Sequence, residues 1–330
     1  MMDLLRRARA RRLATALLVG SIAVVATLAL ATTTAHAFCR TTTTPIPANY
    51  SPTRGCFEDG LPLFWRGACV GYSVNSAASK TIPLATATEV IDEAFNVWNR
   101  AACASGSEVG IQTSNLGPVE CTEVRYNPNG PNQNVVIFRD DRWPYSDPNN
   151  TLGLTTVTFN ADTGEIYDAD MEINATGRNL STATTVPANG FDLLSVVTHE
   201  AGHFLGLAHA TDSKATMFAS YKPGTSALRS LTEDDIAGIC EIFPSATQRR
   251  VATSVAATGI VAADACDPAP RHGFGAGCAE NPAPPDPSSS SGCTVGSGSG
   301  GGGTGSALPL VGLGLALALG AASRRRRVRR

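Results

Sequence analysis

The segment from residue 199 to residue 209 constrains this chain more than any other part of it. It contains His199, Glu200, His203, Gly206 and His209. Two histidines four residues apart on a helix lie on the same face, one turn apart. Gly206 suits the left-handed conformation of a helix end, and the turn there would bring His209 to the same point. Three neutral imidazoles that converge favour tetrahedral zinc, with the fourth position left for water.

The residues before this segment predict the helix that presents it. Asp192 is a suitable N-cap. The apolar residues that follow recur at helical spacing: Leu193, Leu194, Val196, Val197, Ala201, Phe204 and Leu205. Glu200, next to the first histidine, is placed to act as the general base toward a metal-activated water. The alternative is a pair of core histidines, but the glycine and the third histidine match the extended zinc pattern.

The first 37 residues predict export. Five arginines precede an apolar run over residues 13–31, and Ala35-His36-Ala37 matches a cleavage site. This order is typical of a secretory signal peptide. A retained membrane anchor is the alternative, because the apolar run is nearly long enough to span a bilayer.

The other end of the chain predicts a tether and a sorting signal. Residues 246–306 are rich in Ala, Gly, Pro and Ser, and we expect them to form a disordered tether. Residues 307–330 hold a short apolar stretch and an arginine cluster, which would stay on the cytoplasmic side. Together with Cys293 and the glycine-rich spacer they resemble the myxobacterial-type C-terminal sorting signal. That resemblance implies that the tail is trimmed and that the product is displayed at, or released from, the cell surface. A plain C-terminal membrane anchor is the alternative, so C-terminal anchoring would be transient or permanent.

Charge and cysteine content narrow the function further. The net charge of the whole chain is −2, but arginines are concentrated at the two ends, so the segment between them is acidic. An acidic surface argues against a nucleic-acid partner. Nine cysteines in an exported chain suggest disulfides. Candidate local pairs are Cys56 with Cys69, Cys103 with Cys121, and Cys266 with Cys278, although spacing does not determine connectivity.

The middle of the chain alternates helical and strand-like patterns. Residues 38–61 form a short extended segment, and residues 62–245 predict one folded domain that opens with a strand at residues 70–74. An amphipathic helix follows from residue 86. Three strands are expected at residues 135–138, 155–159 and 166–173, and a last helix begins at Thr232.

The third of these strands carries a possible calcium site. Asp168, Asp170 and Glu172 alternate along it, so all three lie on one face. Calcium prefers several carboxylate oxygens. The alternative, which we favour, is a solvated strand edge.

These motifs together resemble the metzincins, and within that clan the matrixins. Met217 stands eight residues past His209, where that clan has its Met-turn methionine. Residues 217–221, which end at Tyr221, are similar to the matrixin wall segment, residues 231–239 to its closing helix and residues 94–99 to its first helix. The resemblance covers roughly residues 62–244.

The resemblance implies a zincin-like α+β fold. This fold has a twisted mixed sheet with an antiparallel edge strand, two long helices and a C-terminal helix after the Met-turn. An extended peptide would pair with the edge strand, next to a pocket walled by Tyr221. Too few histidines remain for a second, structural zinc, so we predict one zinc ion. The propeptide cysteine switch of the family is missing, because Arg54-Gly55-Cys56 is only a scrambled version of it.

Two hypotheses for function follow. The first is an exported, monomeric zinc metalloendopeptidase that acts on polypeptides, with Glu200 as general base. The second is a surface-tethered binding or adhesion protein that retains a zincin shell. Hydrolysis of a non-peptide amide is a third, weaker possibility. The presence of Glu200 favours the enzyme, because a binding shell has no chemical need for that carboxylate.

Overall fold

The computed structural model describes residues 37–47, 49–104, 106–245, 248–254, 257–278 and 315–319. The signal-like residues 1–36 and most of the C-terminal segment 307–330 lie outside the described residues. Within the described residues, no helix combines the length and the hydrophobicity that crossing a membrane requires.

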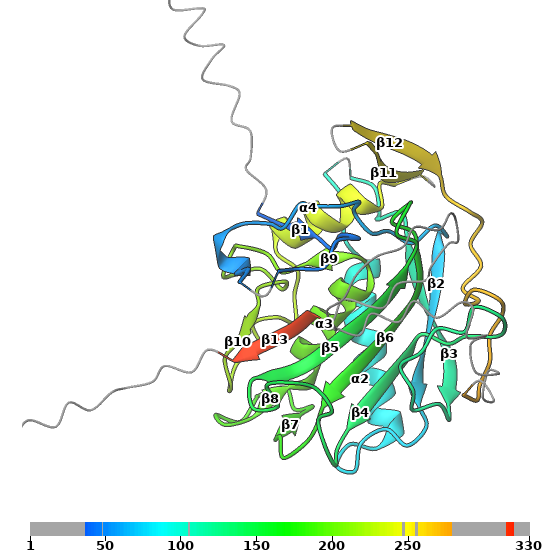
Figure 1. Cartoon of the computed structure of the whole chain (residues 1–330). Helices are drawn as coiled ribbons and strands as arrows, with labels where there is room; N and C mark the ends of the chain where they lie inside the picture. The colour runs from blue at the N-terminus through cyan, green and yellow to red at the C-terminus, as the bar shows by residue number, and fades with distance from the viewer. Residues whose placement is uncertain are drawn as a thin grey trace, which may run out of the picture. The chain divides into compact units, whose positions relative to one another are not determined.

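A seven-stranded mixed sheet forms the centre of the fold (Figure 1). Its strand order is β10-β13-β5-β6-β4-β2-β3. Strands β2, β3, β4 and β6 run parallel to one another, whereas β5 is antiparallel to β6. The expectation of a mixed α+β fold with an antiparallel strand toward the edge is therefore confirmed. The sheet strands are β2 (Cys69–Asn75), β3 (Gln112–Val119), β4 (Val135–Arg139), β5 (Thr151–Phe159), β6 (Ile166–Asn174), β10 (Ser220–Tyr221) and β13 (Leu315–Leu319).

Smaller strand pairs lie around this sheet. Strand β1 pairs with β9, β7 with β8, and β11 with β12. Their bounds are β1 (Cys39–Arg40), β7 (Leu180–Ser181), β8 (Phe191–Asp192), β9 (Leu207–Ala208), β11 (Gln248–Ser254) and β12 (Ala257–Ala262), and a 3-10 turn, η1, spans Pro52–Arg54.

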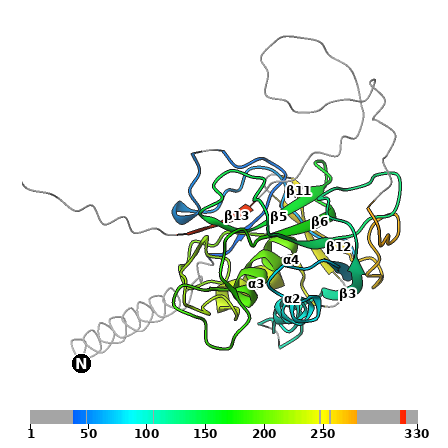
Figure 2. The same cartoon turned by 90° about the horizontal axis from the view of Figure 1, so that it is seen from below.

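Two helices lie side by side on one face of the sheet, α2 (Leu84–Asn99) and α3 (Leu193–Phe204) (Figure 2). Phe95 of α2 packs edge-on against Phe204 of α3 and stacks on Tyr72 of β2. Each large apolar side chain removed from water contributes roughly 1.5–3 kcal/mol. This shared core fixes the position of α3, the helix that carries the histidines.

The third helix, α4 (Glu233–Ile242), begins where the sequence predicts. Thr232 and Asp235 form a capping box at its start, which satisfies N–H groups that the helix itself cannot pair. Ile239 and Ile242 face the core.

The expected cysteine pairs are wrong. Among the described residues the structure has four disulfides, none of them an expected pair: Cys39–Cys56, Cys69–Cys266, Cys103–Cys240 and Cys121–Cys278. For three of them the reason is topological, because the fold brings together cysteines that are more than 130 residues apart in sequence. Spacing along the chain therefore carries no information about these pairs.

The chain also stays folded beyond residue 245, where we expected a tether up to residue 306. Strands β11 and β12 pair antiparallel, and two of the disulfides attach residue 266 to β2 and residue 278 to the segment that follows β3. Arg249 is fully buried, and its guanidinium donates to the carbonyls of Trp65 and Gly67. The expectation rested on the low apolar content of this segment. Disulfides and buried hydrogen bonds keep it folded in place of an apolar core.

Removing the Cys103–Cys240 disulfide should cost more stability than removing Cys39–Cys56. The two bonds close separations of 137 and 17 residues, and loop-closure entropy grows with the logarithm of loop length. We expect Cys103→Ala/Cys240→Ala to lower the free energy of unfolding by about 2 kcal/mol more than Cys39→Ala/Cys56→Ala. Denaturant titration of the two double variants measures the difference, and equal losses would contradict the entropic account.

Candidate metal centre

Helix α3 and the turn after it bring three histidines together. Asp192 caps the helix by accepting the Ser195 N–H at 3.0 Å. His199 and His203 leave the helix one turn apart, and Gly206 ends it with a φ of 99°. The chain then turns back, so that the side-chain nitrogens of His199, His203 and His209 that could bind a metal lie within 4.8 Å of one another.

Backbone carbonyls fix the tautomers of two of these imidazoles. His199 Nδ1 donates to the Thr216 carbonyl at 2.7 Å, and His203 Nδ1 donates to the Leu207 carbonyl at 2.8 Å. The proton on Nδ1 leaves the lone pair on Nε2. The Nε2 atoms of all three histidines are buried and have no hydrogen-bond partner among the described residues.

Burial keeps the imidazoles neutral. It lowers the pKa of His199 to about 4, and it lowers the pKa values of His203 and His209 well below their usual range. Three neutral nitrogens that converge without protein partners are the donor set of a tetrahedral zinc site with an open position. The residues therefore fit a zinc ion.

The floor of the site depends on close packing at Gly202. A Cβ atom built there would meet the sulfur of Met217, and it would lie 2.8 Å from Cζ2 of Trp98. Only glycine leaves room for the methionine, which is 2% exposed. The structure thus places Met217 beneath the helix turn that carries the first two histidines.

The Met217 turn is held by the last helix. Both carboxylate oxygens of Asp235 accept backbone N–H groups, one from Thr216 at 2.8 Å and one from Met217 at 3.1 Å. Because the carbonyl of Thr216 orients His199, the capping residue of α4 also helps to fix an imidazole.

The side chain of Glu200, a residue of α3, lies against strand β5. Its Oε2 accepts the Thr155 hydroxyl at 2.7 Å, whereas its buried Oε1 has no hydrogen-bond partner among the described residues. A Cβ at Gly153 would lie 2.6 Å from Oε1, so the strand needs a glycine there. Burial raises the pKa of Glu200 to about 8, and the Thr155 hydrogen bond opposes that rise.

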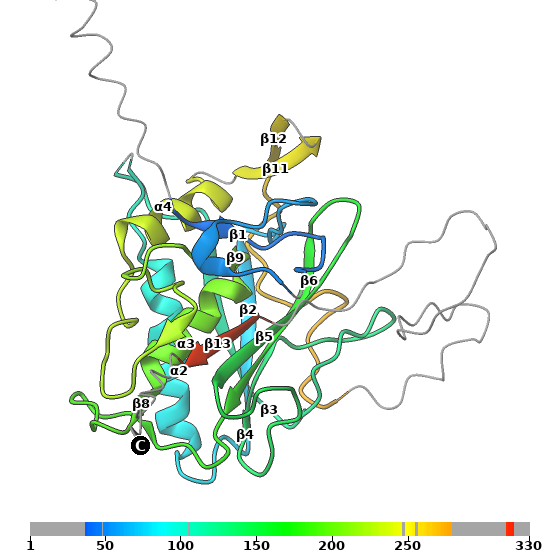
Figure 3. The same ribbon diagram turned by 60° about the vertical axis from the view of Figure 1, so that its left-hand side comes forward.

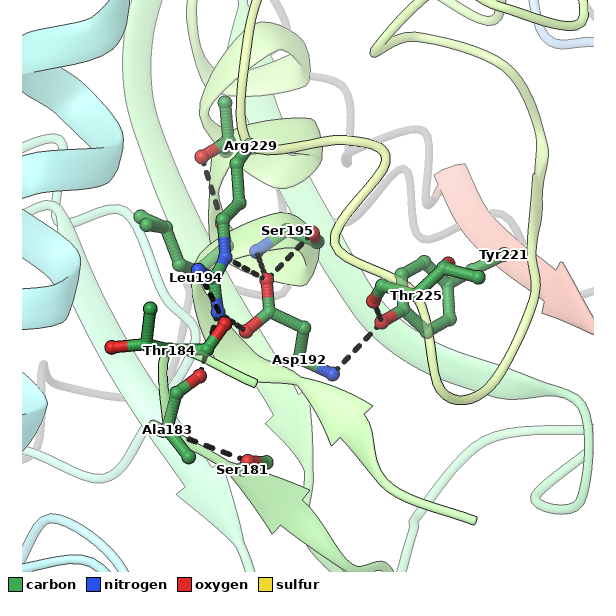
Figure 4. Close-up of polar contacts among 10 residues, drawn as sticks. Ser181, Ala183, Thr184, Asp192, Leu194, Ser195, Tyr221, Thr225 and Arg229 are labelled. Carbon is green, nitrogen blue, oxygen red and sulfur yellow. Dashed lines mark hydrogen bonds and ion pairs between the residues drawn. The ribbon is translucent and has the colours of Figure 1, made fainter. Parts of the chain in front are cut away.

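Tyr221 does not stand free in a pocket wall but is tied to the start of α3 (Figure 4). Its hydroxyl accepts the Asp192 N–H at 2.9 Å and donates to the Thr225 carbonyl. Arg229 forms two bonds to the Asp192 carboxylate, at 2.6 and 2.7 Å, and a third to the Ala183 carbonyl. The segment from β10 to Arg229 is thereby anchored to the helix that carries the histidines.

The three acidic residues of β6 are buried and not solvated, so the preferred expectation of a solvated strand edge is wrong. Asp170 accepts the N–H groups of Arg125 and Val135, at 3.0 and 2.9 Å. Glu172 binds Arg139 at 2.5 Å and accepts the Tyr145 hydroxyl. Asp168 is also buried, and its Oδ1 has no hydrogen-bond partner among the described residues. The contacts of Asp170 and Glu172 attach the loops around residues 125 and 145 to the sheet.

Comparison with known proteins agrees with this geometry. The family model described as Matrixin matches residues 64–244. Metalloendoproteinase 1 of Glycine max is 36% identical over 104 residues, which are 31% of this chain and 32% of the relative. Human matrilysin is 25% identical over 190 residues, 56% of this chain and 61% of the relative. Human neutrophil collagenase is 31% identical over 138 residues, 41% of this chain and 26% of the relative.

The fold and the histidine cluster define a metallopeptidase-like domain of the zincin type. The family match covers more than half of the chain, and the chain belongs to the matrixin family, which is zinc-dependent. The chain spans about a third to three fifths of the length of the first relatives named above.

Several residues that position this site have no motif of their own. Thr155 and Gly153 lie on β5, far from the histidine motif in sequence. Arg229 sits in an irregular loop. Asp235 was visible as an acidic residue in the first turn of a helix, but its bonds to the Met217 turn depend on tertiary structure.

Replacing Arg229 should destabilise the protein, because Asp192 would remain buried without its counter-charge. Asp192 is fully buried, and the Arg229 side chain is 23% exposed. Breaking such a pair costs about 3–5 kcal/mol. We expect Arg229→Met to lower the free energy of unfolding by about 3 kcal/mol in denaturant titration.

The matched control is Arg100→Met, which removes an ion pair with Glu93. In that pair the Arg100 side chain is 60% exposed and the Glu93 side chain is 47% exposed. Exposed pairs contribute about 0–1 kcal/mol. Losses of similar size in the two variants would show that the Asp192 contact adds no more stability than a surface pair.

Asp168 should make stability fall as the pH rises. Burial raises its pKa from 3.8 to about 7, and the pKa of Asp170 is also raised. The folded state then holds a proton that the unfolded state loses above about pH 4, so the stabilisation is complete below that pH and lost toward pH 7. In Asp168→Asn the decline between pH 4 and 7 should flatten in denaturant midpoints. An unchanged pH profile would contradict the raised pKa of Asp168 in the folded state.

Proposed function

We propose that this protein is an exported zinc-dependent metalloendopeptidase. The observation that carries the proposal is the set of three buried Nε2 atoms without protein partners, together with the free Oε1 of Glu200. His199, His203 and His209 would hold the zinc ion, and Glu200 would act as general base. One zinc ion is proposed, since among the described residues the histidine trio is the metal-binding cluster that geometry supports.

Zinc, when bound, supplies a Lewis acid that polarises a carbonyl and makes a water molecule more acidic. The chain supplies the proton transfers. Glu200 takes the proton of the attacking water on Oε1, which has no hydrogen-bond partner among the described residues, while Thr155 holds Oε2. The oxygen of that water adds to the carbonyl carbon. Glu200 then passes the proton to the amide nitrogen, the C–N bond breaks and the amine leaves.

The high pKa of Glu200 suits this role. A carboxylate with an ordinary pKa is a weak base, whereas burial raises the pKa of Glu200 to about 8. A cation bound at the histidines would pull that value down again by attraction. A group whose pKa lies near the working pH can both take and give a proton.

Polypeptides are the proposed substrates. Strand β5 borders Glu200 and lies at the outer side of β6, where an extended chain can add by main-chain pairing. Met217 would form the floor of the zinc site. Tyr221 would fix the wall segment in place. Its hydroxyl would not contact the substrate, because it already forms two hydrogen bonds within the protein.

Export is proposed because four disulfides favour an oxidising compartment. A C-terminal sorting step at residues 307–330 belongs to the same proposal, as does action as a monomer. Control by a cysteine switch is not proposed, because Cys56 is bonded to Cys39 and offers no free thiolate. A calcium ion at β6 is not proposed either, since protein donors already occupy Asp170 and Glu172.

Replacing Glu200 by glutamine tests the mechanism. The isosteric amide cannot accept the proton, so kcat/KM on a peptide library should fall by about 10²–10⁴-fold. Elemental analysis should still find one zinc per chain, because the three imidazoles are untouched. His209→Ala, in contrast, should lose zinc.

Glu93→Gln is the matched control, because it removes a carboxylate from an exposed helix face and should keep full activity. Hydrolysis by Glu200→Gln at the parental rate would refute the assignment of the base. A parent that binds zinc but cleaves nothing in the library would favour a binding protein with a zincin shell.

A further inference from the structure

A segment from the far C-terminal end of the chain lies on the outer edge of β5 (Figures 1 and 3). Strand β13 is antiparallel to β5, with Leu315 opposite Thr155 and Ala316 opposite Leu154. On its other side β13 is parallel to β10, with Ala318 opposite Ser220. The chain thus places one of its own strands between the edge of the main sheet and the wall segment.

The space between β5 and β10 is one strand wide. Neighbouring strands lie about 4.7–4.9 Å apart, and β13 is hydrogen-bonded to both of its neighbours. Strand β13 lies in this groove antiparallel to β5 and parallel to β10, which defines the direction of the bound segment. The N-terminal end of the bound segment lies toward Thr155 and its C-terminal end toward Tyr221.

The register places β13 beside the proposed catalytic base. The pairing shifts between Ala316 and Ala318, which face Leu154 and Thr151. Gly153 lies between these two partners on β5, and it is the residue at which even a Cβ would collide with Glu200. The peptide bonds around residue 317 therefore run past the point where β5 touches Glu200, as those of a peptide bound for hydrolysis must.

The sequence of β13 suits this position. Residues 315–319 are Leu-Ala-Leu-Ala-Leu, and without proline each of them keeps a backbone N–H for pairing. No charge has to be desolvated in the groove. The connecting residues 279–314 span more than about 100 Å when extended, so the tail can reach the groove from residue 278.

We propose that the groove between β5 and β10 binds the C-terminal segment Leu315–Leu319 of the same chain, in the direction and register of a substrate. The inference rests on the proposed peptidase function, and it adds the identity of a peptide that the groove accepts. A tethered ligand is present at an effective concentration that is set by the length of its linker. External peptides therefore compete with the tail for as long as it remains attached.

Two prolines in the tail of the full-length protein test this. Ala316→Pro/Ala318→Pro removes two N–H groups and disfavours pairing, without touching the folded domain. For a competitor in the same chain, KM for an external peptide should fall several-fold while kcat stays constant. The control is Ala321→Pro/Ala322→Pro, which makes the same change just outside β13 and should leave KM at the parental value.

A binding measurement separates this inference from catalysis. The probe is a fluorescent peptide with the sequence of residues 313–326, and Glu200→Gln is included in each protein so that the probe is not cleaved. The probe should bind the proline variant clearly more tightly than the parent, whose groove is occupied. An external substrate peptide should displace it.

The outcomes are distinguishable. Equal KM values together with no probe binding to the proline variant would overturn the inference, even if both proteins cleave peptides. Probe binding to the proline variant in a protein that cleaves nothing would support the inference and refute the proposed peptidase activity. A KM that falls equally in the control variant would also overturn it, since the effect would not depend on β13.

Discussion

The arrangement of this site depends on two hydrogen bonds from imidazole rings to backbone carbonyls. His199 donates to Thr216 and His203 to Leu207, and these bonds turn the free nitrogens inward. Three lone pairs packed closely in a buried site repel one another and have lost their water, which is unfavourable without a cation. The folding free energy of the rest of the domain offsets this cost and keeps the three nitrogens together. A bound cation would increase the stability of the folded state.

The segment that carries the Thr216 carbonyl is in turn held by the last helix. Asp235 caps α4 and binds the N–H groups of Thr216 and Met217, so one carboxylate connects the last helix to the first imidazole. Arg229 and Asp192 do the same for the wall segment and the start of α3. The loops around the site therefore carry buried ionic contacts, and such contacts favour one geometry because alternatives leave a charge unpaired.

The parts of the site that could be predicted are those in which local spacing decides the geometry. Helical periodicity places His199 and His203 on one face, and a glycine with positive φ turns the chain toward His209. The capping residues Asp192 and Thr232 were visible for the same reason.

What escaped prediction depends on contacts between distant segments. Three of the disulfides, the folded residues 248–254 and 257–278, and the buried acidic residues of β6 belong to this class. The acids of β6 were misjudged because alternation along a strand indicates a shared face but not what covers that face. Loops that return over the sheet decide that, and two of them are held by Asp170 and Glu172.

The outer edge of β5 connects stability with function. An uncovered strand edge invites pairing with any extended chain, which is a liability for most proteins and a requirement for a peptidase that binds substrates by their backbone. Main-chain pairing hardly distinguishes one sequence from another, so such a groove has no means of rejecting an apolar segment of its own chain. This lack of sequence selectivity explains the position of β13. A strand edge that pairs through the backbone binds an extended segment held close to it, and the covalent link keeps the C-terminal segment close to β5.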